Sequence, residues 1–191
     1  MYAIPLGDDG AELRPLETWH AEEFLAHLDR GREFINEHVP FGSRATDLDS
    51  ARALLRSYAD RHAADTGFLH GLWLDGTLVG GVLFPDFDAA TGVCEIGCWL
   101  EPAATGRGLV ARGARVLIDW AFDRRGMHRV EWHASAANLP SVNAARRLGM
   151  TLEGVRRESF PYRGVRQDME VWSVLAPEWR AARDRGAAAD R

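Results

Sequence analysis

The stretch TGRGLVARG, residues 105–113, decides how this chain is interpreted, since it combines three glycines with two arginines. Apolar residues recur at helical spacing in and after it, at Val110, Ala114, Leu117 and Ala121. Amides left unpaired at the start of a helix point outwards, and the helix dipole favours negative charge there. Gly106 and Gly108 let a bulky anion approach the backbone. We therefore expect this stretch to hold a phosphate group.

Length and composition indicate one globular domain with a sizeable core, because the chain has 191 residues and is 46% hydrophobic. We expect this domain over residues 1–178 and a polar C-terminal tail, or a frayed helix, over 179–191. A net charge of −5 and a pI near 5.8 argue against direct nucleic-acid binding and weakly favour a cationic partner. The start lacks a signal peptide pattern, and no apolar run reaches the ~18 residues of a membrane span. We expect a cytoplasmic protein that does not bind membranes.

The cysteines and histidines predict neither a disulfide nor a metal site. Cys94 and Cys98 are four residues apart in a predicted strand, hence roughly 13 Å apart at ~3.3 Å per residue, too far for a mutual disulfide. The seven histidines do not fall into spacings typical of zinc sites.

The predicted elements alternate in a regular order. Asp75-Gly76 between two β-rich runs is a strong hairpin signal, and Pro40 and Gly42 predict a loop over 33–44. The expected order is helix 16–31, helix 46–64, hairpin 67–87, strand 91–100, helix 110–126, strand 128–135, helix 140–149 and two strands within 150–175.

Two nucleotide-binding patterns fit the glycines poorly. The triphosphate loop requires a lysine after its last glycine, and none is present. Residues 106–111 do fit the dinucleotide pattern G-x-G-x-x-G/A, with Glu131 about 20 residues on, where an acid contacts the ribose. However, four residues separate the preceding strand from the glycines, whereas that turn normally leaves the strand directly.

Two longer stretches carry a more specific signal. They are EIGCWLEPAATGRGLVARGARVLIDWAF, residues 95–122, and HRVEWHASAANLPSVNAARRLGMTLEGVRRE, residues 128–158. Together they resemble the GNAT superfamily of acetyl-CoA-dependent N-acetyltransferases, in its RimJ/RimL branch, and the resemblance covers about residues 10–175. It implies an α+β fold whose mixed central sheet of about seven strands splays between strands 4 and 5, with flanking helices.

The resemblance also implies where acetyl-CoA binds. The family's phosphate motif, Gln or Arg, two residues, Gly, one residue, Gly or Ala, falls on Thr105, Gly108 and Val110, so only the central glycine is kept. The implied cofactor-binding residues are Cys98, Trp99 and Leu100, whose backbone pairs with the pantetheine arm, and Thr105, Gly106, Arg107, Gly108, Leu109 and Val110. Because backbone amides hold the phosphates, loss of the first side chain matters less than loss of Gly108. Arg112 is a second candidate for phosphate charge.

The sequence NLPS, residues 138–141, matches the N-x-x-S pattern of the RimJ/RimL branch. The resemblance implies that Asn138 contacts the cofactor arm and that Ser141 hydrogen-bonds the coenzyme sulfur and helps protonate the departing thiolate. Either residue also suits an N-cap of the following helix, and both roles are compatible.

Glu95 matches a strand carboxylate that serves as general base in some family members. A carboxylate paired for structural reasons is the alternative. Glu131 and Glu158 are rival bases, of which Glu158 is the better candidate. Period-2 alternation puts Cys94, Ile96, Cys98 and Leu100 on the core face of the strand, and Glu95, Gly97 and Trp99 on the other. Cys98 is therefore expected to be structural rather than a nucleophile.

The resemblance places the amine acceptor near two segments, whose candidate residues are Phe34, Glu37 and Phe41, and Tyr162 and Asp168. Aromatic and acidic side chains suit an ammonium group, although the aromatics also suit ordinary packing. The expected acceptor is a protein N-terminal amine, for example of a ribosomal protein. The alternatives are a small-molecule amine, such as an antibiotic or polyamine, and a non-catalytic acyl-CoA sensor, which the off-pattern Thr105 and Val110 keep open. A homodimer also remains open.

Overall fold

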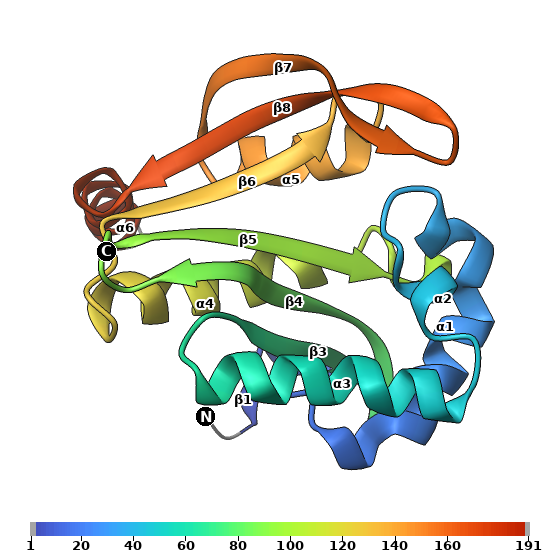
Figure 1. Cartoon of the computed structure of the whole chain (residues 1–191). Helices are drawn as coiled ribbons and strands as arrows, with labels where there is room; N and C mark the ends of the chain where they lie inside the picture. Colours follow the sequence, from blue (N-terminus) through green and yellow to red (C-terminus); the bar gives the residue numbers. More distant parts are fainter. Residues whose placement is uncertain (1–2, 190–191) are drawn as a thin grey trace. The chain divides into compact units, whose positions relative to one another are not determined.

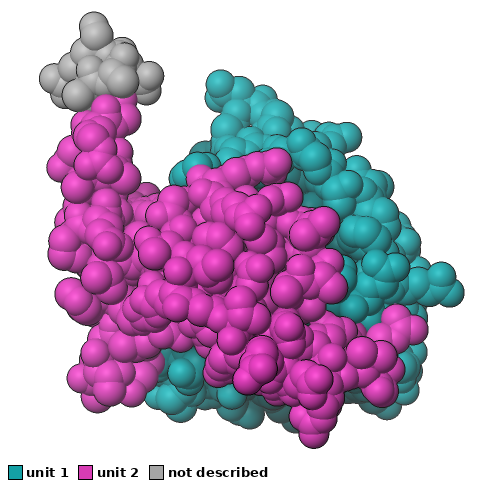
Figure 2. Space-filling model, turned by 90° about the horizontal axis from the view of Figure 1, so that it is seen from above, with its two compact units in different colours: residues 1–87, 96–116 teal, residues 88–95, 117–191 magenta. Residues whose placement is uncertain are grey.

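The structure, a computed structural model, describes residues 3–189. The chain forms two compact units, shown in different colours in Figure 2. The first comprises residues up to Phe87 together with Ile96–Val116, and the second comprises Asp88–Glu95 and the residues from Leu117 onwards. Among residues 3–189, no helix combines the length and the apolar character needed to cross a membrane.

The first unit contains an antiparallel run of strands in the order β1 (Ile4–Pro5), β2 (Ala11–Pro15), β3 (Phe68–Leu74) and β4 (Thr77–Asp88). The turn between β3 and β4 has positive φ at both Asp75 (49°) and Gly76 (78°), as a two-residue type I′ turn requires. The predicted hairpin is therefore confirmed. Strands β1 and β2 were not expected, because two and five residues carry little periodic signal.

The helices of this unit are α1 (Ala21–Asn36), α2 (Phe41–Arg44) and α3 (Leu48–Ala63), with short 3-10 turns η1 (Thr18–His20) and η2 (Pro102–Ala104). Figure 1 shows α3 running along β3 and β4. Asp47 caps α3 by accepting a hydrogen bond from the Ser50 amide at 2.8 Å. The loop expected over 33–44 is largely helical, because α1 continues past a kink at Gly31 and because the Phe41 side chain anchors α2 in the core.

Strand β5 (Val93–Leu100) passes from the second unit into the first. Its first residues, Val93–Glu95, pair in parallel with Arg129–Glu131 of β6 (Arg129–Ser135). Among the described residues this parallel pairing comprises three residue pairs, although both strands continue. The sheet is therefore mixed, as predicted, and the described residues form eight strands in it where about seven were expected.

The second unit continues from β6 to β8 (Val165–Leu175) and then β7 (Thr151–Tyr162), all antiparallel. Its helices are α5 (Leu139–Arg147), the later part of α4 (Leu109–Asp123) and α6 (Ala176–Ala189). Figure 1 shows β6, β8 and β7 side by side, with α5 next to β6. The predicted helices and strands from residue 110 to 175 are thus confirmed.

The C-terminal segment, expected as a polar tail or a frayed helix, is helical up to residue 189. Residues 179–189 belong to α6, and Trp179 is buried. Its indole N–H donates to Asp119 at 2.7 Å, while Arg180 and Arg183 pair with Asp123. One apolar anchor thus fixes a helix whose composition suggested little to bury. Residues 190 and 191 lie outside the described part.

Candidate functional site

The glycine stretch forms an exposed turn that leads directly into α4. The Thr105 hydroxyl and amide both donate to the Pro102 carbonyl, at 2.8 and 3.1 Å, so Thr105 closes η2. Gly106 and Gly108 have φ of 79° and 71°, and a Cβ at either position would meet nothing within 4 Å. The Gly108 carbonyl accepts from the Arg112 amide at 3.0 Å, which makes Gly108 the N-cap of α4. The amides of the first turn of α4 have no partner within the helix, and unpaired amides at a helix start favour anion binding.

The two candidate arginines have different environments. The Arg112 guanidinium donates to both Asp9 oxygens, at 2.8 and 2.7 Å, and to the carbonyls of Leu6 and Arg107. The hydrogen bond from Arg112 lowers the pKa of Asp9 to about 2. Arg107 is exposed. Arg112 is thus engaged by the N-terminal segment, whereas the Arg107 side chain lies at the surface of the loop.

A buried polar network holds the end of β5. The indole Nε1–H of Trp99 donates to His27 Nε2 at 3.0 Å, and His27 Nδ1 lies 3.1 Å from Glu101 Oε2. An indole N–H is only a donor, so Nε2 must carry the lone pair and the proton must lie on Nδ1, donated to Glu101. Burial lowers the pKa of His27, in agreement with this neutral tautomer. Arg30 completes the network, at 3.1 Å from Glu101 and 2.6 Å from the Leu78 carbonyl.

Glycines in α1 and β4 leave room for this arrangement. A Cβ on Gly31 of α1 would lie 3.0 Å from Pro102 and 3.2 Å from Glu101, and a Cβ on Gly81 of β4 would overlap the Trp99 ring. Helix α1 therefore packs against the chain between β5 and the glycine loop. This close approach explains the kink at Gly31, which the sequence predicted as a helix end.

The expected faces of β5 are only partly observed. Cys94 and Ile96 are buried as predicted, but Trp99 is also buried, at 3% exposure, because α1 and α2 cover its side of the strand. The Phe41 ring packs edge-on against Trp99, with 4.9 Å between ring centroids. Cys98 and Leu100, expected on the core face, are half-buried. Burial of the thiol group raises the pKa of Cys98 to about 12, which suits a structural cysteine and not a thiolate nucleophile.

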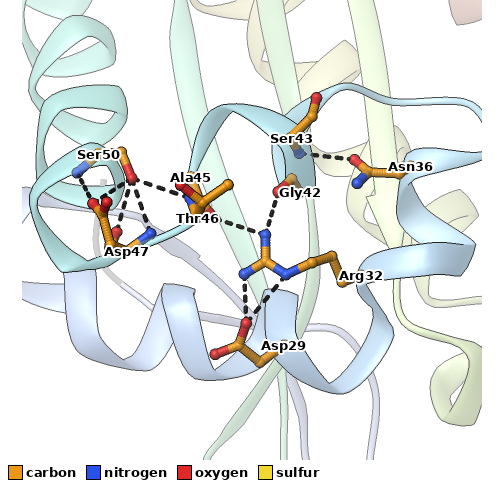
Figure 3. A network of polar contacts seen from close by, with 9 residues as sticks. All are labelled: Asp29, Arg32, Asn36, Gly42, Ser43, Ala45, Thr46, Asp47 and Ser50. Carbon is orange, nitrogen blue, oxygen red and sulfur yellow. Dashed lines mark hydrogen bonds and ion pairs between the residues drawn. The ribbon is translucent and has the colours of Figure 1, made fainter. Parts of the chain in front are cut away.

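The candidate acceptor residues of the first unit lie at the end of α1, at Phe34, and in the segment that joins α1 to α3, at Glu37 and Phe41. Phe34 and Glu37 are exposed, whereas Phe41 is 4% exposed and belongs to the core, so ordinary packing accounts for it. Figure 3 shows the polar contacts that hold this segment. Arg32 binds Asp29 and the carbonyls of Gly42 and Ala45, Asn36 accepts from the Ser43 amide, and Asp47 and Ser50 form the cap of α3.

The second unit places Glu95 in a chain of charged groups. Glu95 lies 3.2 Å from Nδ1 of His133, whose Nε2 lies 3.0 Å from Glu131. Glu131 accepts from Arg129 at 2.7 Å, so this rival base is engaged on both sides. Arg129 also binds Glu153. Hydrogen bonding to Glu95 raises the pKa of His133.

Ser141 and Asn138 occupy the start of α5. The Asn138 side chain accepts from the Ser141 amide at 3.2 Å, so Asn138 is the N-cap. The buried Trp132 indole donates to the Ser141 hydroxyl at 2.9 Å. The hydroxyl thus receives one hydrogen bond and keeps its own proton to donate, as the expected contact with a coenzyme sulfur requires.

Glu158 lies in an irregular part of β7. Its φ is 51°, unusual for a residue with a side chain, and the pairing of β7 with β8 shifts register between Arg156 and Phe160. The Glu158 amide donates to Asp168 at 2.8 Å, so Asp168 supports this irregularity. Tyr162 stacks on Phe160, with 5.5 Å between ring centroids.

The predicted site residues are thus divided between the two units. The first holds the cofactor set 98–100 and 105–110 with Phe34, Glu37 and Phe41, and the second holds Glu95, Asn138, Ser141, Glu158, Tyr162 and Asp168. The supporting residues His27, Glu101, Trp132 and His133 were not anticipated. Alternation of Arg129, Glu131 and His133 along one face of β6 was the available signal for the last. Within residues 3–189, no group of three or more His, Cys, Asp or Glu is placed to hold a metal ion.

Comparison with known proteins assigns this architecture to a family. The Acetyltransferase (GNAT) domain profile matches residues 11–151. The chain is 30% identical to "Probable N-acetyltransferase YjcK" of Bacillus subtilis, over 87% of this chain and 94% of that protein. It is 27% identical to "Putative ribosomal N-acetyltransferase YdaF" of Bacillus subtilis, over 87% and 92%.

A solved structure of RimL, the ribosomal L7/L12 α-N-protein acetyltransferase in complex with coenzyme A, has the same fold, with a TM-score of 0.85 at 19% identity over 91% of this chain and 97% of that one. The chain therefore belongs to the GNAT family and is an acetyl-CoA-dependent acetyltransferase.

Proposed function

We propose that this acetyltransferase moves an acetyl group from acetyl-CoA directly to the N-terminal α-amine of a protein, such as a ribosomal protein. The observation that carries the proposal is the exposed Gly106–Gly108 turn before α4, with positive φ at both glycines, inside the matched family region. The choice of acceptor is supported by the names of two similar proteins, YdaF and RimL.

For the donor, the amides at the start of α4 bind the diphosphate, and Arg107 adds positive charge. The backbone of Cys98, Trp99 and Leu100 pairs with the pantetheine arm as an added strand would. The buried contact between Trp99 and His27 keeps this strand end in place. These roles explain why Thr105 and Val110 can depart from the family motif, since neither role uses their side chains.

For the chemistry, the acceptor must first lose a proton, because an ammonium group has no lone pair. An α-amine has a pKa of about 7.7–8.0, so it needs less help than a lysine, at about 10.4. Glu95 accepts this proton, the amine attacks the thioester carbonyl, and the C–S bond breaks. Ser141 donates a hydrogen bond to the thiolate, which takes up the second proton lost by the amine nitrogen and leaves as the free thiol. Glu158, on its irregular strand, is the alternative base.

For the acceptor, we propose Phe34 and Glu37 as contacts in the first unit, and Tyr162 and Asp168 as contacts in the second. Cys94 and Cys98 are not joined by a disulfide, which fits a reducing compartment, and we propose the cytoplasm.

The test is acetyl transfer to peptides that begin with serine or alanine, measured by thiol release and by the acetyl mass on the peptide. Lysine ethyl ester, spermidine and an aminoglycoside serve as competing acceptors. Because the chain contains no lysine, acetylation of its own side-chain amines cannot mimic turnover. Preference for peptides supports the proposal, and preference for a small amine overturns its acceptor. Binding of acetyl-CoA without transfer to any acceptor would instead identify a sensor.

A further inference from the structure

His133 lies in the polar chain around Glu95, and the reaction described above gives it no role. Its Nδ1 is 3.2 Å from Glu95 and its Nε2 is 3.0 Å from Glu131. The His133 side chain is 17% exposed, against 32% for Glu95 and 23% for Glu131. Nε2 is thus hydrogen-bonded to Glu131 on the same strand, β6, and Nδ1 forms an ion-pair contact with Glu95 on the parallel strand β5.

This geometry favours a charged ring. A neutral imidazole has one N–H and one lone pair, so it donates to one carboxylate and turns its lone pair towards the other. An imidazolium donates to both. The hydrogen bond to Glu95 and the charges of both carboxylates raise the pKa of His133, against the opposing effect of burial.

The remaining neighbours do not supply another charge to the ring. Val171 of β8 lies opposite His133 in the sheet, and Ser173 lies opposite Glu131. Ser173 donates to Glu153, which binds Arg129. Within the described residues of the second unit, the charged groups near His133 are therefore Glu95 and Glu131, with Arg129 and Glu153 one step further away.

Glu131 and Glu95 differ in the number of polar groups that bind their carboxylates. Glu131 is held by Arg129 as well as by His133. Among the described residues, the polar partner of Glu95 is His133 alone, through one carboxylate oxygen. The second oxygen of Glu95 is thus available to another group.

We propose that His133 is a positioning residue that orients Glu95 for proton transfer and, through its own charge, sets how strongly Glu95 attracts the proton of the acceptor amine. This inference rests on the proposed function. In the step itself, the ammonium proton moves to the free oxygen of Glu95 and later to water. The amine lone pair forms the C–N bond as the C–S bond breaks, and the second proton that the nitrogen loses ends on the departing thiolate. A charged His133 weakens Glu95 as a base, and a neutral one strengthens it.

The first experiment does not depend on turnover. The protein is labelled with ¹³C-histidine, and the His133 signal is assigned by its loss in His133→Gln. We expect His133 to titrate above 6.5 and its midpoint to fall towards 6.5 in Glu95→Gln. A midpoint at or below 6.5, or one that Glu95→Gln does not move, would overturn the coupling. Glu95 is partly exposed, so this variant is expected to fold.

The second experiment compares pH profiles of kcat/KM for acetyl transfer to a serine-initiated peptide. The profile of the wild type is expected to bend at two pH values, one set by the titration of His133 and one by that of the peptide amine. In His133→Gln the first bend of the profile is expected to disappear and kcat to fall about tenfold, while the KM for acetyl-CoA stays unchanged. His128→Gln, at an exposed position of the same unit, is the matched control and should keep both bends. Two bends and full kcat in His133→Gln would refute the role.

The histidine titration and the pH profiles distinguish failure of the proposed function from failure of the coupling between His133 and Glu95. If no amine is acetylated by any variant, the proposed function fails. The histidine titration then still decides whether His133 and Glu95 are coupled.

Discussion

The indole N–H of Trp99 donates a hydrogen bond to His27 at 3.0 Å, across 72 residues of sequence. His27 in turn donates to Glu101. Replacement of His27 by phenylalanine leaves both the indole N–H and part of the Glu101 carboxylate without a partner. We expect a loss of about 1–3 kcal/mol in the free energy of unfolding for each orphaned group. Urea denaturation measures this loss, and His128→Phe, at an exposed site, should change stability by less than about 0.5 kcal/mol.

The same network predicts a pH dependence of stability. Burial lowers the pKa of His27 in the folded protein, so the unfolded chain binds a proton more readily. The stability that neutral His27 contributes is present above about pH 6.5 and is lost as the pH falls below that value. Unfolding free energies at pH 7.5 and 5.5 should therefore differ less in His27→Gln than in the wild type. An equal or larger difference in the variant would contradict a neutral buried His27.

Arg107 and Arg112 allow a matched test of the phosphate site. Arg107 is exposed on the loop, whereas Arg112 binds Asp9 and the Leu6 carbonyl. We expect Arg107→Ala to weaken acetyl-CoA binding about three- to tenfold and to reduce its salt dependence. Arg112→Ala should mainly lower stability. Calorimetric titration at two salt concentrations distinguishes them, and the reverse order of effects would reassign the phosphate charge to Arg112.

Ser141 and Trp132 allow a similar separation. Ser141→Ala removes the hydroxyl, so we expect turnover to fall about tenfold, or about 1.4 kcal/mol in the barrier, with little change in acetyl-CoA affinity. Trp132→Phe keeps the hydroxyl and removes the hydrogen bond that it accepts. We expect a smaller loss of turnover from this variant, together with lower stability. Full turnover in Ser141→Ala would remove this hydroxyl from the chemistry.

Local signals predicted much of the fold because they do not depend on distant contacts. The Asp75-Gly76 turn is set by a few neighbouring residues, and it is observed. The helix from Val110 follows from its apolar spacing. By contrast, β1 is two residues long and depends on pairing with β2, so it has no signal of its own.

The site was less predictable where its contacts are distant in sequence. Alternation placed Trp99 away from the core, yet α1 and α2 bury it against Phe24 and Phe41. Phe41 was expected near the acceptor for the same reason, since an aromatic residue in a predicted loop does not reveal what packs on it. His133 gains its role from a carboxylate on another strand. Periodicity shows the face of a residue but not the partner it meets.

Calorimetric titration of acetyl-CoA into wild type, Gly108→Ala and Gly126→Ala tests whether the cofactor binds at the turn before α4. Gly108 and Gly126 have φ of 71° and 67°, and a Cβ at either would meet no protein atom within 4 Å. The backbone strain of the two variants is therefore matched, but only Gly108 lies at the start of α4. We expect Gly108→Ala to weaken binding at least about tenfold and Gly126→Ala to leave it unchanged. Equal affinity in all three proteins would contradict binding of the cofactor at this turn.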